Sequence, residues 1–331
     1  MQNDPFLAAL SRMGLLEPGE TPVVTALTGG VSSDIVRVDL RRGPVCIKRA
    51  LPKLKVEADW QAPVERNHWE IEWMKVAAGV EPDAVPQILG EDAGNGMFVM
   101  SFLPPESYPV WKTQLRDGTI STDTAREVGR RIAAIHGATA GKLEIAKRFA
   151  TDHIFHPIRL EPYLSATAKR HPALADRLQS LVRVTGATKK ALVHGDVSPK
   201  NILVGPHGPV FLDAECAWYG DPAFDLAFCL NHLLLKCVWR PRWTTRYLEC
   251  FDVLAQTYLS NVGWEPAVDI EARTAHLLPG LMLGRIDGKS PVEYITEEQD
   301  RECVRAFAGE LLARPAGTLA ALRDAWTVAL K

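Results

Sequence analysis

The stretch LVHGDVSPKNILVGPHGPVFLDAE, residues 192–215, decides the fold. An apolar, strand-like run ends at the tripeptide His-Gly-Asp, whose aspartate is Asp196, and Asn201 follows five residues later. A turn at residues 205–208 leads into a second apolar run, which ends at Asp213. Because two short strands joined by a turn pair side by side, the sequence predicts that these three polar side chains surround one site.

The spacing of these residues is typical of phosphoryl transfer. That reaction needs a carboxylate to orient or deprotonate the acceptor hydroxyl, and oxygen ligands for the magnesium on the nucleotide phosphates. The catalytic loop of protein kinases meets both needs with His-Arg-Asp-x-x-x-x-Asn, and His194, Asp196 and Asn201 have the same spacing here. Asp213 stands where a second magnesium ligand is expected. The alternative is that these acids and amides only cap loops beside a hairpin.

Three segments in order, HGDVSPKN, FLDAE and GDPAFDLA, resemble the aminoglycoside phosphotransferase family, which is related to choline kinases and methylthioribose kinases. The resemblance spans roughly residues 20–310 and is strongest over 192–228. It implies a small-molecule kinase that uses ATP and Mg²⁺. It further implies that Asp196 is the catalytic base, that Asn201 and Asp213 hold metal, and that Glu215 is a candidate third ligand.

The rest of the chain is consistent with an α+β, protein-kinase-like fold of two lobes. Residues 21–50 and 85–103 alternate like antiparallel strands, and helical periodicity separates them over residues 64–78. After Pro104-Pro105, helical patterns dominate at residues 121–137, at 171–186 and from Pro222 onward. Gly137 is expected to end the first of these helices. We therefore expect an N-terminal nucleotide-binding lobe at residues 1–102. A larger, mainly helical catalytic and substrate-binding lobe is expected at residues 103–331.

Lys48 is the expected phosphate-binding cation. It ends a strand-like run, VCIK, as the corresponding lysine of kinases does. Its carboxylate partner is Glu70 or Glu72 on the following helix, and Glu70 fits the family's helix pattern better. On its own, a lysine at a strand end is usually a solvated edge residue.

Two backbone segments are expected to contact the nucleotide. The loop with Gly29, Gly30, Ser32 and Ser33 lies between two strands, where small residues can face phosphates, although a plain hairpin turn explains it nearly as well. Asp34 is an awkward negative charge there. The segment Met100-Ser101-Phe102-Leu103 resembles the hinge, with the Ser101 carbonyl and the Leu103 N–H as expected partners of adenine.

Substrate contacts are harder to predict. The segment GRIDGKSP at residues 284–291 imitates a P-loop, but its first glycine is one residue too close. Arg285 and Asp287 within it are candidate substrate residues, and a polar loop between helices is the alternative. Asp221 and Asp225 are expected to brace the catalytic loop rather than to react.

Composition excludes several other classes of protein. The 331 residues carry a formal net charge of −2 and 47% hydrophobic residues, so nothing indicates binding to nucleic acid or a membrane. Six scattered cysteines read as free thiols, and without a signal sequence or an apolar span the expected location is the cytoplasm. The oligomeric state and the small hydroxyl-bearing acceptor stay open.

Two rival functions remain at this stage. The first is a nucleotide-binding regulator of the same fold that has lost catalysis. The second is an atypical protein kinase, which the missing arginine before Asp196 and the missing Asp-Phe-Gly and Ala-Pro-Glu motifs make less favourable.

Overall fold

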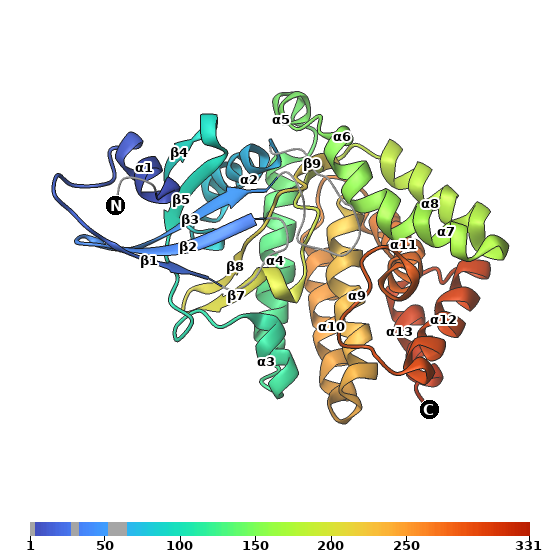
Figure 1. Cartoon of the computed structure of the whole chain (residues 1–331). Helices are drawn as coiled ribbons and strands as arrows, with labels where there is room; N and C mark the ends of the chain where they lie inside the picture. The colour runs from blue at the N-terminus through green and yellow to red at the C-terminus, as the bar shows by residue number, and fades with distance from the viewer. Residues whose placement is uncertain (1–3, 28–32, 52–64) are drawn as a thin grey trace.

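The computed structural model describes residues 4–27, 33–51 and 65–331. A β-sheet near the N-terminus forms one lobe, and a larger set of helices that ends at the C-terminus forms the other (Figure 1). The two-lobed α+β expectation is confirmed. The boundary between residues 102 and 103 stays a prediction.

The smaller lobe is built on a five-stranded antiparallel sheet. Its spatial order is β1-β2-β3-β5-β4. The strands are β1 (Val23–Ala26), β2 (Ser33–Leu40), β3 (Gly43–Ala50), β4 (Ile88–Asp92) and β5 (Met97–Ser101). Helix α1 (Pro5–Arg12) and helix α2 (Arg66–Val80) complete the lobe.

The two faces of this sheet bury different side chains, because alternate residues of a strand point to opposite faces. Val45 and Ile47 of β3 pack with Leu10 of α1 in a small apolar cluster. Cys46 of β3 and Phe98 of β5 instead belong to the main core, which also contains α2 and the helical lobe. Lys48 is two residues after Cys46 on the same strand, so the two side chains lie on the same face of the sheet, the face that packs against α2.

The larger lobe is mainly helical. Its long helices are α4 (Thr122–Thr139), α8 (Ala175–Ala187), α9 (Ala223–Trp239), α10 (Thr244–Ser260), α11 (Ala267–Asp287), α12 (Glu298–Ala313) and α13 (Leu319–Ala329). Shorter helices are α3 (Trp111–Asp117), α5 (Leu143–Arg148), α6 (Asp152–Phe155) and α7 (Ala166–Arg170), and a π-helical segment covers His156–Ser165. Helix α9 is buried along almost its whole length.

The deciding stretch forms short strands beside these helices (Figure 1). Strand β6 (Ala191–Val193) pairs with β9 (Trp218–Gly220), and β7 (Ile202–Gly205) pairs with β8 (Gly208–Phe211). The turn between β7 and β8 lies where the sequence predicts it. Asp196 therefore follows β6, Asn201 immediately precedes β7, and Asp213 follows β8.

The helix predicted at residues 121–137 differs at its end. Ser121 caps α4 by accepting a hydrogen bond from the Thr124 N–H at 3.3 Å, as the sequence suggests. Gly137 does not stop the helix, which continues to Thr139. A Cβ at Gly137 would lie 3.2 Å from the ring of Trp264, so close packing explains this glycine better than helix termination. Among the described helices, none is long and apolar enough to cross a membrane.

Candidate active site

Lys48 lies at the centre of a buried charge cluster. Its ammonium Nζ is 2.7 Å from Glu70 Oε2, 2.6 Å from Asp213 Oδ1 and 3.0 Å from Glu215 Oε1. Burial disfavours the charged lysine, but the three carboxylates outweigh this effect and hold the pKa of Lys48 well above its ordinary value. The three carboxylates thus favour the charged form of Lys48 and hold its ammonium in place.

The structure also separates the two glutamates of α2. Glu70 is buried and faces Lys48, whereas Glu72 pairs with Lys75 at 2.8 Å and with Arg148. Residues two apart on a helix do not share a face. The partner of Lys48 is therefore Glu70, the residue that the helix pattern favours.

Asp213 and Glu215 approach Lys48 from the helical lobe. Asp213 has a φ of 69°, the only left-handed value at a non-glycine position in the described chain. Glu215 also accepts hydrogen bonds from Arg66 Nε and Ser33 Oγ, both at 2.9 Å. The β-sheet lobe and the helical lobe thus meet through these two carboxylates.

Glu70, Asp213 and Glu215 form a group of carboxylates of the kind that can hold a divalent cation, and in this structure the Lys48 ammonium lies among them. One carboxylate oxygen from each lies within 4.8 Å of the others. Burial raises the pKa of Glu70 above its ordinary value despite Lys48, whereas Lys48 and Lys200 outweigh burial and hold the pKa of Asp213 low. Mg²⁺ prefers such hard oxygen ligands.

Asp196 is held at one carboxylate oxygen and left open at the other. Oδ2 lies 2.9 Å from Arg159 Nη2 and 3.3 Å from Lys200 Nζ. Oδ1 is buried and has no hydrogen-bond partner in the parts of the chain that the structure describes. Burial acts to raise the pKa of Asp196, but Lys200 and Arg159 outweigh it and keep this pKa below its usual value. The low pKa favours the ionised carboxylate, and Oδ1 is its oxygen without a partner among the described residues.

Asp225 of α9 holds the backbone of the candidate catalytic loop, residues 194–201. The backbone N–H groups of His194 and Gly195 donate to its two carboxylate oxygens at 2.7 and 2.8 Å. His136 of α4 lies 3.2 Å from the same carboxylate. Asp221 instead pairs with Arg273 at 3.1 Å. Asp225 thus braces the catalytic loop as expected, whereas the contacts of Asp221 are with α11 and the start of α9.

Neighbouring backbone fixes the rest of the loop. The Asn201 side chain donates to the Asp196 carbonyl at 3.2 Å, which ties the candidate metal ligand to the candidate base. Gly195 has a φ of 81°, and a Cβ there would lie 2.8 Å from the Cys216 carbonyl oxygen. The glycine of His-Gly-Asp is therefore required by conformation and by space.

Of the four residues predicted for the phosphate loop, the structure describes Ser33. Gly29, Gly30 and Ser32 lie outside the described residues, while Ser33 begins β2 and donates to Glu215. Asp34 pairs across the strands with Arg49 at 2.5 Å. That cation offsets the negative charge that seemed awkward beside phosphates.

The predicted hinge covers the last two residues of β5 and the two residues after it. The Ser101 N–H donates to the Gln87 carbonyl at 2.9 Å, and Met100 packs in the core. For the Leu103 N–H, no hydrogen-bond acceptor is found within the described residues. A hollow of about 620 Å³ borders Ser101 and Leu103 on the side of Tyr108 and His207.

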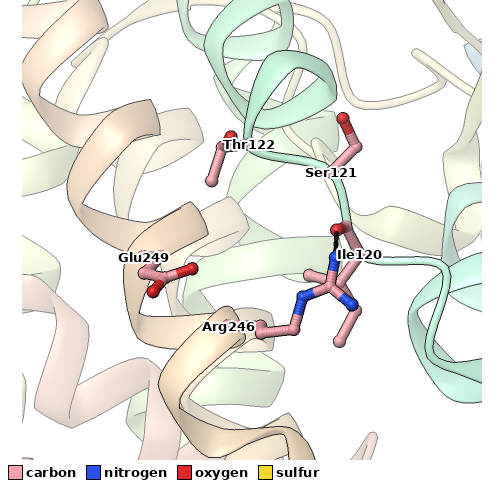
Figure 2. A pocket seen from close by; sticks show the side chains of 5 residues that line it. All are labelled: Ile120, Ser121, Thr122, Arg246 and Glu249. Atoms are coloured by element: carbon pink, nitrogen blue, oxygen red, sulfur yellow. Dashed lines mark hydrogen bonds between the residues drawn. The ribbon is translucent and has the colours of Figure 1, made fainter.

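A separate hollow of about 360 Å³ lies at the start of α4 (Figure 2). Its lining is Ile120, Ser121, Thr122, Arg246 and Glu249. The Arg246 guanidinium reaches across it to the Ile120 carbonyl (Figure 2) and so joins α10 to the start of α4. None of the predicted site residues lines this hollow.

The two candidate substrate residues point to different partners. Arg285 donates to Tyr163 Oη at 3.3 Å and to Ser290 Oγ at 3.0 Å. Asp287 pairs with Arg305 at 2.9 Å and with His171 at 2.8 Å. The Asp287 carboxylate is thus used in joining helices, and its substrate role stays a prediction without a supporting contact.

Comparison with known proteins agrees with this geometry. Residues 23–260 match the phosphotransferase enzyme family. The chain belongs to this family. The methylthioribose kinase of Escherichia coli O45:K1 (strain S88 / ExPEC) is 25% identical over 259 residues, which cover 69% of this chain and 61% of that protein. The chain therefore matches less than two thirds of the length of that curated relative.

Solved structures share the fold of this family member. An amicoumacin kinase, solved in complex with AMP-PNP, Ca²⁺ and Ami, superposes with a TM-score of 0.59 at 12% identity and 96% coverage of both chains. The Plasmodium vivax ethanolamine kinase superposes with a TM-score of 0.56 at 13% identity, covering 96% of this chain and 88% of that one.

Sequence reasoning missed several residues of this candidate site. Arg159 contacts both the Gly195 carbonyl and Asp196, yet it lies 37 positions before Asp196 in the sequence, outside any motif. Lys200 lies inside the HGDVSPKN motif, so its position four residues after Asp196 was a usable signal. Arg66 carried no signal, because only folding brings it to Glu215.

Proposed function

We propose that this chain transfers the γ-phosphoryl group of ATP, in a Mg²⁺-dependent reaction, to a hydroxyl group of a small molecule. The observation that supports this most strongly is the Asp196 carboxylate, with Oδ2 held by Arg159 and Lys200 and Oδ1 free. Membership of the phosphotransferase enzyme family and the names of the relatives, which are kinases of small molecules, agree with it.

In the proposed reaction Asp196 orients the acceptor hydroxyl and takes its proton on Oδ1. The hydroxyl oxygen forms a bond to the γ-phosphorus while the bond from that phosphorus to the β–γ bridging oxygen breaks. The products are ADP and a phosphate ester of the acceptor. A base held ionised by neighbouring cations suits this role, because it only needs to accept the proton as the new bond forms.

The charged residues around Lys48 would bind the phosphates and the metal. Lys48, oriented by Glu70, would hold the inner phosphates, and Asp213 with Asn201 and Glu215 would hold Mg²⁺. Bound Mg²⁺ would neutralise the developing charge on the transferred phosphoryl group. Ser33, with Gly29, Gly30 and Ser32, is proposed to line the phosphates.

Adenine is proposed to bind at the hinge. The Ser101 carbonyl and the Leu103 N–H would be its partners beside Met100, and the free Leu103 donor supports this. Residues 1–102 would then provide the nucleotide lobe and residues 103–331 the base and the acceptor site. Closure of the two would exclude water and limit hydrolysis of ATP.

Asp196→Asn tests the proposal directly. It keeps the size of the side chain but removes the proton acceptor, so we expect the rate of Mg²⁺-dependent transfer from ATP to fall by about 10²–10⁴-fold. Asp252→Asn is the control, because Asp252 forms only a surface pair with Arg323 at 3.2 Å. Acceptors are found by screening hydroxylated metabolites and aminoglycosides with a nucleotide analogue in a thermal-shift assay.

The rival functions give different results in the same assay. Equal transfer by wild type and Asp196→Asn would refute the assignment of the base. Binding of ATP without transfer to any member of a broad metabolite library would favour a nucleotide-binding regulator. Transfer to protein side chains alone would favour an atypical protein kinase.

A further inference from the structure

Three cationic or titratable side chains gather behind the catalytic loop in what we term the basic cluster, made of His232, Lys236 and Arg285. His232 and Lys236 lie one turn apart on one face of α9. Arg285 comes from the last turn of α11. Tyr294 joins them, since its ring centroid is 4.8 Å from Lys236 Nζ and its hydroxyl 3.4 Å from His232 Nδ1.

The basic cluster is buried but its polar atoms are poorly satisfied. Lys236 is 1% exposed, and its ammonium lies 4.8 Å from the ring centroid of Tyr294 and 5.3 Å from that of Trp239. Within the same described residues, His232 Nε2 and Arg285 Nε are buried without a hydrogen-bond partner. Buried polar groups are nearly always paired, so this arrangement indicates a missing acceptor.

The acidic side chains that neighbour Arg285 and Tyr294 in the sequence are already paired. Glu293 pairs with Lys112, and Asp287 pairs with Arg305 and His171. An excess of buried positive charge is therefore left at Lys236 and Arg285, and such a charge is costly unless it is paired. Burial, with Lys112 adding to it, lowers the pKa of Lys236 to about 7.

The basic cluster lies next to the candidate base. Arg159, which pairs with Asp196, also lies over the Phe228 ring at 5.9 Å, and the Phe228 and His232 rings are 5.6 Å apart. A second route runs from Phe228 through Tyr163 to Arg285, with ring centroids 5.5 Å apart and a 3.3 Å hydrogen bond. One aromatic residue, Phe228, thus lies between the His232 ring of the cluster and the Arg159 guanidinium that pairs with Asp196.

We propose that the basic cluster binds an anionic oxygen group, a carboxylate or a phosphate, of the acceptor molecule. This inference rests on the proposed phosphotransferase function and adds the chemical class of its substrate. The acceptor is then a small hydroxylated anion. Its charged end is held by Lys236 and Arg285, and its hydroxyl faces Asp196. A polycationic acceptor such as an aminoglycoside would meet like charges here and would be rejected.

Direct binding of anions tests the site without any catalysis. Malonate, D-glycerate and inorganic phosphate are titrated into the full chain by calorimetry, at fixed ionic strength. We expect saturable binding of at least one anion, weakened about tenfold or more by Lys236→Met. Lys169→Met, which removes an exposed lysine of α7, is expected to leave the affinity unchanged.

The class of acceptor is tested with matched pairs that differ in one acidic group. D-Glycerate is compared with glycerol, D-gluconate with D-glucose, and D-ribose 5-phosphate with D-ribose, in transfer from ATP with Mg²⁺. We expect transfer to favour the anionic member, and the carboxylate and phosphate arms tell the two sources of charge apart. Lys236→Met should raise the KM for the anion about tenfold while the KM for ATP changes less than about twofold.

Arg285→Gln is the second variant, should Lys236→Met fail to fold, and it is expected to weaken the same anion. The proposal is overturned if the wild type binds none of the anions at about 10 mM, which is ten times a KM of ~1 mM. It is also overturned if both variants bind the anions as tightly as the wild type does. Transfer to neutral or cationic hydroxyl compounds alone would overturn it while leaving the phosphotransferase proposal standing. Anion binding at the basic cluster with no transfer from ATP to any compound would instead refute the proposed function.

Discussion

The Lys48 ammonium and the Asp213 carboxylate lie 2.6 Å apart, although 165 residues separate them in the sequence. Lys48 comes from the sheet and Asp213 from the loop after β8, so their contact joins the two lobes. Asp213 holds a left-handed backbone conformation to reach it. Such a conformation at a non-glycine residue is costly and is typical of functional positions.

Asp213→Asn separates the charge of this residue from its shape. Asparagine tolerates the left-handed region, so we expect the protein to stay folded. Without the carboxylate, metal-dependent transfer should fall by about 10²–10³-fold, and more Mg²⁺ should be needed for half-maximal activity. A titration of ATP turnover with Mg²⁺ measures both effects. A variant as active as wild type at every Mg²⁺ concentration would contradict a metal role for Asp213.

Asp225→Asn should loosen the catalytic loop. The two N–H groups of His194 and Gly195 would then face one carbonyl oxygen and one amide N–H₂ instead of two acceptors. We expect the free energy of unfolding to fall by about 1–3 kcal/mol, with a lower kcat because the backbone that leads into Asp196 is held less firmly. Urea unfolding gives the first quantity and steady-state kinetics the second. Asp252→Asn is the matched control and should change stability by about 1 kcal/mol or less.

Gly195→Ala tests why this chain has His-Gly-Asp. A φ of 81° and a Cβ 2.8 Å from the Cys216 carbonyl oxygen both oppose a side chain. We expect a loss of about 1–3 kcal/mol in the free energy of unfolding, together with reduced transfer. The control is Gly263→Ala, where no atom lies within 4 Å of the added Cβ, and its stability should stay the same or rise by about 0.4–1 kcal/mol. Equal effects at both glycines would show that the loop adapts.

Lys236→Met should stabilise the ligand-free protein in a pH-dependent manner. The folded pKa of Lys236 is about 7, below the unfolded value of 10.5. Below pH 7 both states carry the charge, so its burial cost is fully present. Between pH 7 and 10.5 only the unfolded state keeps the proton, so this cost is lost as the pH rises. The groups that face Lys236 are Lys112, His232, Arg285, Glu293, Cys229 and Tyr294.

Unfolding in urea at pH 6 and pH 9 measures this effect. The gain in the free energy of unfolding of Lys236→Met over wild type should be larger at pH 6 than at pH 9. Lys169→Met should show no such difference. A gain that is the same at both pH values would mean that Lys236 is neutral throughout, or that its charge is already compensated.

Much of the fold was predictable because its signals are local. Three features follow from residues that are close together in the sequence: the turn between β7 and β8, the cap at Ser121, and the face of β3 on which Lys48 lies. Helical geometry allows only one of Glu70 and Glu72 to face Lys48, and the resemblance to the family's helix pattern selected Glu70. The apparent stop at Gly137 misled, since nothing local reveals that Trp264 packs against it.

The surroundings of the site were less predictable because distant segments supply them. Arg159 lies on a π-helical segment that no hydrophobic periodicity in the sequence predicts. Arg66 contacts Glu215 only because folding brings these distant residues together. Lys236 offered one unused signal. It interrupts the otherwise apolar end of α9, Leu233–Val238, and a lysine in such a run is seldom there for solubility.

The contacts of Glu215 with Arg66 and Ser33, and of Asp213 with Lys48, have a kinetic consequence. All of them cross from one lobe to the other, so separating the lobes must break them together. We therefore expect the rate of nucleotide exchange to be limited by how often these interlobe contacts break, rather than by diffusion of the nucleotide. Ser33→Ala and Arg66→Lys would then speed both the arrival and the departure of a nucleotide while changing its equilibrium affinity comparatively little.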